Sequence, residues 1–172
     1  LSVTRTVLEK GKGNCLLKPV GKEATMFSKI SQQQFNSIDP IFRVIVHDHP
    51  RKFYSLQLPG ASHALAMCWR SALIVPVIAI APLSSSVLIG VDQRVASVAP
   101  AGNTLFSMGL NSSLLDIKHF QNRTVVLCET QALVINHDYS LRKTCDLRDI
   151  AVSADIKNDV LIVMLLNGES EE

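Results

Sequence analysis

Residues 86–110 of the chain read SVLIGVDQRVASVAPAGNTLFSMGL, and residues 123–147 read RTVVLCETQALVINHDYSLRKTCDL. In both stretches an apolar segment ends at an acidic residue, Asp92 or Glu129, after which a polar pair and a second apolar segment follow. A group of turn-forming residues then leads to a third segment, so that the two stretches match at a shift of 36 to 37 residues. A partial third copy occupies residues 159–168. The sequence therefore predicts a repeated unit of three or four short strands.

A repeat of this length is typical of a β-propeller blade or a β-meander. Each unit is a small antiparallel sheet that cannot bury its faces alone, so neighbouring units must stack. Two copies and a fragment are too few to close a propeller, which needs at least four blades. We therefore predict a mainly β protein with little helix, in which antiparallel sheets form an open two-layer or incomplete-propeller arrangement. We expect one domain over residues 1–172, with N-terminal strands and a hairpin in 1–82 and the repeat region in 83–172.

Strand-like segments also fill the N-terminal half. We expect strands at residues 3–8, 15–20, 25–30, 42–46, 53–58 and 73–80. Ser31 could cap a short helical turn over 32–38, and Ser62 could cap a second one over 64–69.

Two predicted strands are apolar at consecutive positions, namely 73–80 and 160–166. A strand that is apolar at both parities is expected to be covered on both faces. Pro76 cannot donate a hydrogen bond to a neighbouring strand, so it marks an edge, a bulge or a break in the first of them.

Composition excludes several classes of protein. The chain has 172 residues, of which 47% are hydrophobic and 19% charged, so it is not intrinsically disordered. A net charge of +2 is too small for a protein that coats nucleic acid. The longest apolar run, residues 72–82, is shorter than the roughly 18–20 residues that span a membrane. Without a signal-peptide pattern and without paired cysteines, we expect a cytoplasmic protein with reduced, buried thiols.

No complete catalytic motif is present, so we expect a protein that is not an enzyme and needs no cofactor. The best metal candidate is His47-Asp48-His49 with Asp39 nearby, because two histidines at alternate positions of an extended strand project from the same face. The same residues also suit a solvated hairpin connection between the strands at 42–46 and 53–58, which we favour because the sequence names no third ligand.

Two other constellations have a catalytic and a structural interpretation. Cys68 could form a nucleophilic pair with His63, but a buried cysteine beside the core residue Trp69 is the favoured interpretation. Asp92 and Glu129 could act as paired acids, but equivalent positions in two repeats more often share a turn geometry.

Charge is distributed unevenly along the chain. Residues 144–172 hold seven acids and two bases, a net charge of −5, whereas the remaining residues carry +7. The acidic segment could attract a basic protein partner, although an ordinary solvated face is also compatible with it. The carboxylates expected to contact a partner are those of Asp138, Asp146, Asp149 and Asp155.

The repeat also resembles a known group of proteins. The segments 87–92 and 125–129, each followed by a second apolar strand, together with 147–150 and 167–169, are similar to small bacterial proteins with propeller-blade-like repeats. Some of these are immunity proteins of polymorphic toxins. The resemblance covers residues 86–169 and implies a non-catalytic protein that binds a cognate toxin, plausibly a basic one, and occludes it.

Two alternatives remain open at this point. One is a metal-dependent enzyme or ligand-binding module that uses His47 and His49. The other is a structural β protein that associates with a second copy through an open edge at residues 160–166.

Overall fold

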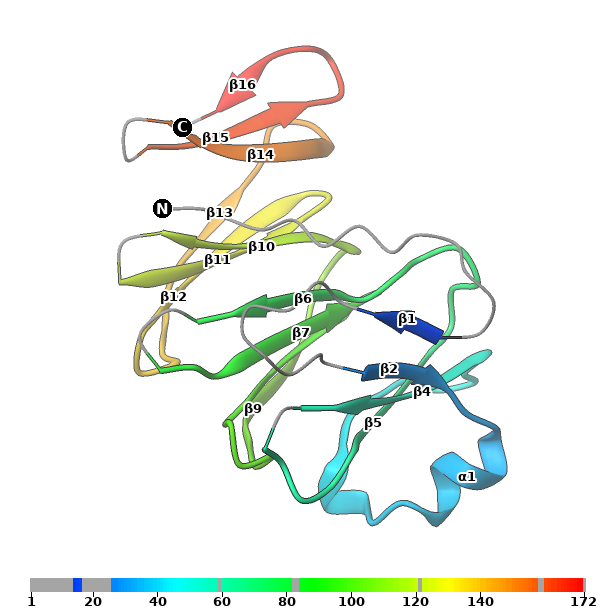
Figure 1. Cartoon of the computed structure of the whole chain (residues 1–172). Coiled ribbons are helices and arrows are strands. Elements are labelled where there is room, and N and C mark those ends of the chain that lie inside the picture. The colour runs from blue at the N-terminus through cyan, green and yellow to red at the C-terminus, as the bar shows by residue number, and fades with distance from the viewer. Residues whose placement is uncertain are drawn as a thin grey trace.

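The computed structural model describes residues 14–16, 26–58, 60–81, 84–120, 122–157 and 160–171. Four open sheets are stacked one on another in the order of the chain, from the sheet that contains β2 to the sheet that contains β15 (Figure 1). We call them sheets A to D. The predicted fold class, mainly β with open sheets and little helix, is confirmed. Within the described residues, no helix combines the length and the apolar character needed to cross a bilayer.

Sheet A has the strand order β1-β2-β4-β5-β3. Its strands are β1 (Asn14–Leu16), β2 (Met26–Lys29), β3 (Arg43–Val46), β4 (Lys52–Gln57) and β5 (Leu65–Trp69). The pairs are antiparallel except for β3 and β5, which run parallel. Helix α1 (Gln32–Ser37) and the 3-10 helix η1 (Pro40–Phe42) connect β2 to β3.

Sheets B, C and D are successive antiparallel meanders. Sheet B consists of β6 (Val77–Ile80), β7 (Val87–Val91), β8 (Arg94–Val98) and β9 (Thr104–Gly109). Sheet C consists of β10 (Leu114–Phe120), β11 (Arg123–Cys128), β12 (Gln131–Asn136) and β13 (Leu141–Asp146). Sheet D consists of β14 (Ala151–Lys157), β15 (Val160–Leu165) and β16 (Ser170–Glu171).

Hydrogen bonds between the sheets repeat with the sequence. The backbone N–H of Leu114 donates to the carbonyl of Asp92 at 2.7 Å, and the N–H of Ala151 donates to the carbonyl of Glu129 at 2.7 Å. Donor and acceptor in the second pair both lie 37 residues after those in the first. The predicted repeat is therefore a repeat of three-dimensional structure, in which each sheet is joined to the next in the same way.

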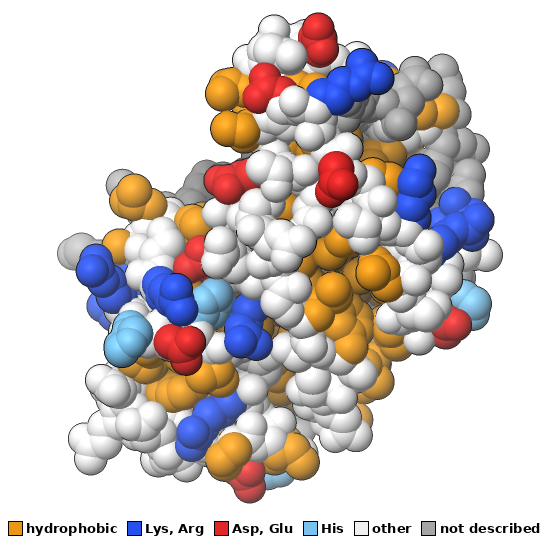
Figure 2. Space-filling view, turned by 180° about the vertical axis from the view of Figure 1, so that it is seen from behind, with side chains coloured by type: hydrophobic (Ala, Val, Ile, Leu, Met, Phe, Trp, Pro, Cys, Tyr) orange, Lys and Arg blue, Asp and Glu red, His pale blue; other side chains and the backbone are white. Residues whose placement is uncertain are grey.

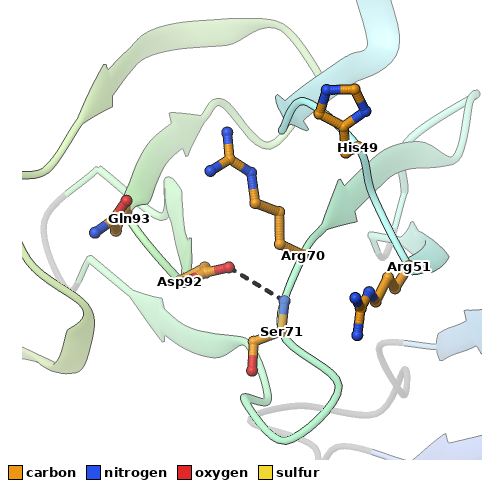
Figure 3. Close-up of a pocket in the computed structure, with 6 residues that line it drawn as sticks. All are labelled: His49, Arg51, Arg70, Ser71, Asp92 and Gln93. Atoms are coloured by element: carbon orange, nitrogen blue, oxygen red, sulfur yellow. Dashed lines mark hydrogen bonds between the residues drawn. The ribbon is translucent and has the colours of Figure 1, made fainter.

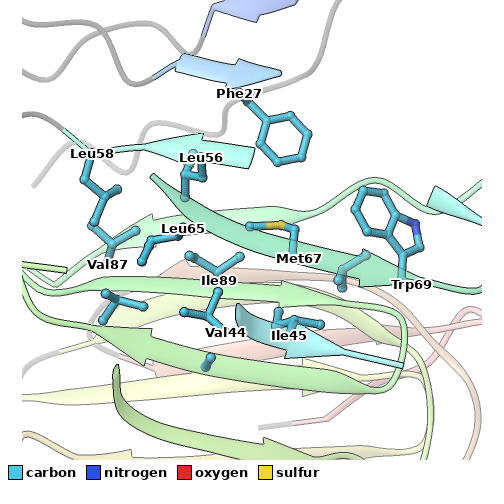
Figure 4. Packing of buried hydrophobic residues seen from close by; sticks show 13 residues of the cluster. Phe27, Val44, Ile45, Leu56, Leu58, Leu65, Met67, Trp69, Val87 and Ile89 are labelled. Carbon is cyan, nitrogen blue, oxygen red and sulfur yellow. The ribbon is translucent and has the colours of Figure 1, made fainter. Parts of the chain in front are cut away.

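Three apolar layers hold the stack together. Between sheets A and B, Leu65, Met67 and Trp69 pack against Val87 and Ile89 (Figure 4). The second layer, between sheets B and C, contains Leu88, Val95, Leu114, Ile117, Val126 and Leu133. The third, between sheets C and D, contains Val125, Leu127, Ala132, Ala151, Val163 and Leu165.

The N-terminal half confirms one predicted helix and corrects another. Ser31 caps α1 as predicted, with a capping box in which Gln34 returns a side-chain bond to the Ser31 backbone at 2.8 Å. The helix expected after Ser62 is wrong, because these residues form β5. Alternate β5 residues face sheet B, whereas Ala66 and Cys68 face α1 and Phe35. Because β5 is buried on both faces, its consecutive residues are mostly apolar. A short apolar run of this kind cannot be distinguished from a short buried helix by local sequence.

Three strand predictions also need correction or comment. The connection between the strands at 42–46 and 53–58 is not a hairpin, because β5 lies between β3 and β4. The strand expected at 73–80 begins only at Val77, directly after Pro76, as a break at proline predicts. The strand at 3–8 and most of that at 15–20 fall outside the described residues.

The strand at 160–166 was expected to be covered on both faces, and this is wrong. One face of β15 packs on sheet C through Val163 and Leu165, which are 4% and 2% exposed. The other face remains open, with Val160 and Met164 exposed at 38% and 40%. No further sheet covers it among the described residues.

Candidate functional site

Turns and strand ends from successive sheets meet at one end of the stack. The Asp92–Gln93 turn of sheet B bonds to Leu110 and Leu114, and the Glu129–Thr130 turn of sheet C bonds to Leu147 and Ala151. Sheet A reaches the same end, because the Asp92 carboxylate accepts a hydrogen bond from the backbone N–H of Ser71 at 3.3 Å. We call this end, with its residues Arg51, Arg70, Asp92, Gln93, Glu129, Thr130, Asp146 and Asp149, the turn surface.

A shallow pocket of about 410 Å³ lies on the turn surface between sheets A and B (Figure 3). Its lining residues are His49, Arg51, Arg70, Ser71, Asp92 and Gln93. We call it the cationic pocket, since two guanidinium groups and one imidazole surround a single carboxylate. Its polar walls and open mouth suit an anionic group that a partner presents from solution.

The two arginines are held differently. The Nε–H of Arg70 donates to the carbonyl of Asp48 at 2.8 Å, and its Nη2 lies 3.6 Å from the Asp48 carboxylate. Both side chains of this ion pair are largely exposed, at 56% and 89%, so the pair is weak. Arg51 precedes β4, where its backbone N–H donates to the carbonyl of Trp69 at 2.8 Å. Within the described residues its side chain forms no ion pair.

His47 lies behind the cationic pocket, and the prediction that it belongs to a solvated turn is wrong. It is 8% exposed, and its buried Nε2 has no hydrogen-bond partner among the described residues. Burial lowers the pKa of His47, an effect that the nearby Asp92 carboxylate opposes and that Arg94 and Arg70 reinforce. The imidazole of His47 is therefore uncharged at pH 7. It packs between the end of β3 and sheet B.

The candidate metal site, which the sequence did not favour, is not assembled in the described residues. His49 has a φ of 51°, so the backbone is not extended there and the two histidines do not share a face as predicted. Asp39 accepts a hydrogen bond from the backbone N–H of Ile41 at 3.0 Å and caps η1. Among the residues that the structure describes, no three His, Cys, Asp or Glu side chains are grouped so that they could hold a metal ion.

The cysteines have structural surroundings. Cys68 is 1% exposed, and burial raises the pKa of its thiol. His63 is instead exposed and stacks on Phe42, with ring centroids 4.6 Å apart. Burial, with a smaller contribution from Glu129, raises the pKa of Cys128 to about 11. Cys68, Cys128 and Cys145 are free cysteines in the structure.

Asp92 and Glu129 serve turns, as the favoured interpretation predicted. The carboxylate of Asp92 accepts from the backbone N–H of Ser71, and that of Glu129 accepts from the backbone N–H of Ser113 at 3.4 Å. Each acid thus holds the segment that leads into a neighbouring strand.

The four carboxylates expected to contact a partner do not form one patch. Asp146 ends β13 and Asp149 follows it, so both lie on the turn surface. Asp138 precedes β13 and therefore lies at the opposite end of sheet C, where hydrogen bonds from the Ser140 side chain and backbone lower its pKa. Asp155 lies on β14, directly opposite Ile162 on the open face of sheet D.

The sequence did not point to the cationic pocket. Arg51 precedes one strand and Arg70 follows the next, and only the pairing of β4 with β5 places them beside each other. Asp92 comes from a different sheet. Arg51 precedes the predicted strand at 53–58, but Arg70 follows a segment for which the sequence predicts a helix, so the sequence does not indicate that the two arginines are neighbours.

The named arginines and most of the named acids occupy different parts of the turn surface, although Asp92 lines the cationic pocket and Arg148 stands between Asp146 and Asp149 in the sequence. The cationic pocket lies over sheets A and B, whereas Glu129, Asp146 and Asp149 lie over sheets C and D. In Figure 2, blue and pale-blue side chains gather around a red one at the lower left, and several red side chains lie above them with a blue one at the top.

Comparisons with known proteins give no family for this chain. No family model matches it, and no curated protein does. One similar solved structure is that of a protein of unknown function from Bacteroides caccae, which is 12% identical. The match covers 88% of this chain and 52% of that protein, with a TM-score of 0.46. The chain thus spans about half the length of the structure that it resembles, a protein without a known function.

Proposed function

We propose that the protein is a non-catalytic protein-binding module that contacts its partner through the turn surface. The observation that carries the proposal is the charge separation on this surface. The cationic pocket presents Arg51 and Arg70 at one side, and Asp146 and Asp149 lie on the other side.

Stacked sheets give such a surface the rigidity that recognition needs. The turns project from β7 and β11, whose apolar side chains are almost entirely buried between neighbouring sheets. Repeated units that stack in this way build extended binding surfaces from their successive turns. Charges held on a rigid surface accelerate association and fix the orientation of the partner.

The partner on this proposal has a complementary charge pattern. Its basic side chains would face Asp146 and Asp149, and a carboxylate or phosphate would enter the cationic pocket between Arg51 and Arg70. The most specific form of the proposal is an immunity protein in the cytoplasm that covers a basic toxin, which is what the sequence resemblance implies. Buried thiols with raised pKa values favour a binding role over a nucleophilic one.

The test begins with affinity capture of a stoichiometric partner from the native organism at low salt. The dissociation constant of that complex is then measured for the wild type and for the double variant Asp146→Lys/Asp149→Lys. Because like charges facing each other are strongly unfavourable, we expect weakening by about tenfold or more. Arg51→Glu/Arg70→Glu should weaken the same complex.

Asp138→Lys is the control, since it makes one of the same Asp-to-Lys charge reversals at the opposite end of sheet C and should leave the dissociation constant unchanged. Equal weakening by the control, or the absence of any stoichiometric partner, would overturn the proposal. Loss of the partner's own toxic activity in the complex would favour the immunity form over a general binding module.

A further inference from the structure

The outer face of sheet D is the one large sheet face in the described residues on which apolar side chains of a central strand stay open. We define this face by Val160, Ile162 and Met164 of β15 with their cross-strand neighbours Asp155 and Lys157 of β14. Residues directly opposite each other on antiparallel strands share a face. Val160 and Met164 are exposed at 38% and 40%.

In the preceding repeats, the face that corresponds to the outer face of sheet D is covered by another sheet. Ile162 and Met164 stand 37 residues after Val125 and Leu127. In sheet C these two side chains are 3% and 0% exposed, because sheet D covers them. One repeat earlier, Leu88 is 1% exposed and faces sheet C. The outer face of sheet D thus continues a series of faces that each receive another sheet.

The charged residues beside this face make it complementary to itself. Asp155 lies opposite Ile162, and Lys157 lies opposite Val160 one pair further along the same strand. The covered face of sheet C has an acid and a base in similar places, where the Lys118 Nζ and the Asp116 carboxylate are 3.1 Å apart. Both lie on β10 and pair within that strand, and their side chains are 13% and 25% exposed, so an acid and a base can be accommodated on a sheet face that another sheet covers.

We propose that a second copy of this chain covers the outer face of sheet D with its own sheet D, giving a two-fold symmetric dimer. A two-fold axis brings the same patch of both chains together. The Ile162 and Met164 side chains of the two subunits form the centre of the interface, and Asp155 of each faces the partner subunit's Lys157. The stack of four sheets is thereby extended to eight.

This association uses a face and not an edge. β15 is bonded to β14 along its length and to β16 at Val163 and Met164, so we place the association on the face of the sheet; pairing of the segment 160–166 through its edge stays an untested alternative. The turn surface remains free in such a dimer, so the inference is independent of the proposed function.

Sedimentation equilibrium over a wide range of protein concentration tests the inference. We expect a reversible monomer–dimer equilibrium for the wild type. Met164→Glu places a charge at the centre of the interface and should raise the dimer dissociation constant at least about tenfold. Leu73→Glu is the control, because Leu73 is 94% exposed on another part of the molecule. It should dimerise like the wild type, and circular dichroism should show that both variants are folded.

A charge swap keeps the test decisive even if Met164→Glu fails to fold. Asp155→Lys should weaken the dimer, because it places a lysine of each subunit opposite the partner subunit's Lys157. The double variant Asp155→Lys/Lys157→Asp should restore the dimer, because it exchanges the two charges. A wild type that is monomeric at every concentration, or a dimer that persists unchanged in Met164→Glu and Asp155→Lys, would overturn the inference.

Discussion

Sheets C and D are built from similar central strands but bury them to different extents. In β11 the four consecutive side chains of residues 125–128 are all buried. In β15, which has the same apolar character, only Val163 and Leu165 are buried. The difference comes from position: sheet C lies between two sheets, and sheet D has one neighbouring sheet among the described residues. A strand that is apolar on both faces can therefore be covered by a neighbouring sheet on each face.

Truncation at equivalent positions should produce the largest effect. Leu127→Ala removes a side chain that is fully buried between sheets C and D, and we expect a loss of about 2–5 kcal/mol in the free energy of unfolding. Met164→Ala, 37 residues later, should cost about 1 kcal/mol or less, because this side chain is 40% exposed.

Urea denaturation of both variants measures this difference, at a protein concentration low enough to keep any dimer dissociated. Similar losses for the two variants would break the comparison, because they would mean that the two strands are buried equally.

A glycine in sheet B should give the next largest effect. Gly90 precedes Leu127 by 37 residues, and a Cβ atom built on it would collide with the Leu114 side chain of sheet C. Gly90→Val should therefore destabilise the protein by about 1–3 kcal/mol through overpacking between sheets B and C.

Gly109→Val is the matched control, because nothing lies within 4 Å of a Cβ atom at that position. Thermal unfolding of both variants provides the comparison. A stability of Gly90→Val equal to that of the control would show that sheets B and C do not approach each other as closely as described.

Lowering the pH should have the smallest effect on the stability of the fold, and this effect should come from histidines in sheets A to C. Burial lowers the pKa of both His47 and His119, so the folded protein favours their neutral forms. The unfolded chain takes up these protons at about pH 6.5, the usual value for histidine. The stability that depends on the neutral imidazoles is therefore present above this pH and is lost as the pH falls through the two lowered pKa values.

Melting temperatures between pH 8 and pH 5 should fall for the wild type, less steeply for His47→Gln and for His119→Gln, and least steeply for the double variant. Identical slopes in all four proteins would contradict the assignment. Sheet D contains no histidine, so truncations in sheet D should not change the slope.

The repeat made most of the fold predictable. Strands such as β7 and β11 are short Val, Ile and Leu segments between turn residues, so their signals are local, and the shift of 37 residues linked them. The errors occurred where pairing is not local. The parallel insertion of β5 between β3 and β4 has no signature within either segment, and burial on both sides made β5 resemble a helix.

The candidate site was predictable in part for the same reason. Asp146 and Asp149 were found because they belong to a run of acidic residues. Asp138 precedes the acidic segment 144–172, and it lies at the other end of sheet C because β13 crosses the sheet between Asp138 and Asp146. The cationic pocket needs β4, β5 and β7 to be aligned at one end, which depends on the stacking of two sheets.

Solvent accessibility of side-chain methyl groups tests the central claim, that burial follows position in the stack, most directly. NMR relaxation by a soluble paramagnetic probe can be compared for Val125 and Leu127 of β11 and for Ile162 and Met164 of β15. In dilute protein the account predicts strong relaxation of the β15 methyl groups and almost none of the β11 methyl groups. Raising the protein concentration should protect only the β15 groups. Equal protection of both strands in dilute protein would contradict the account.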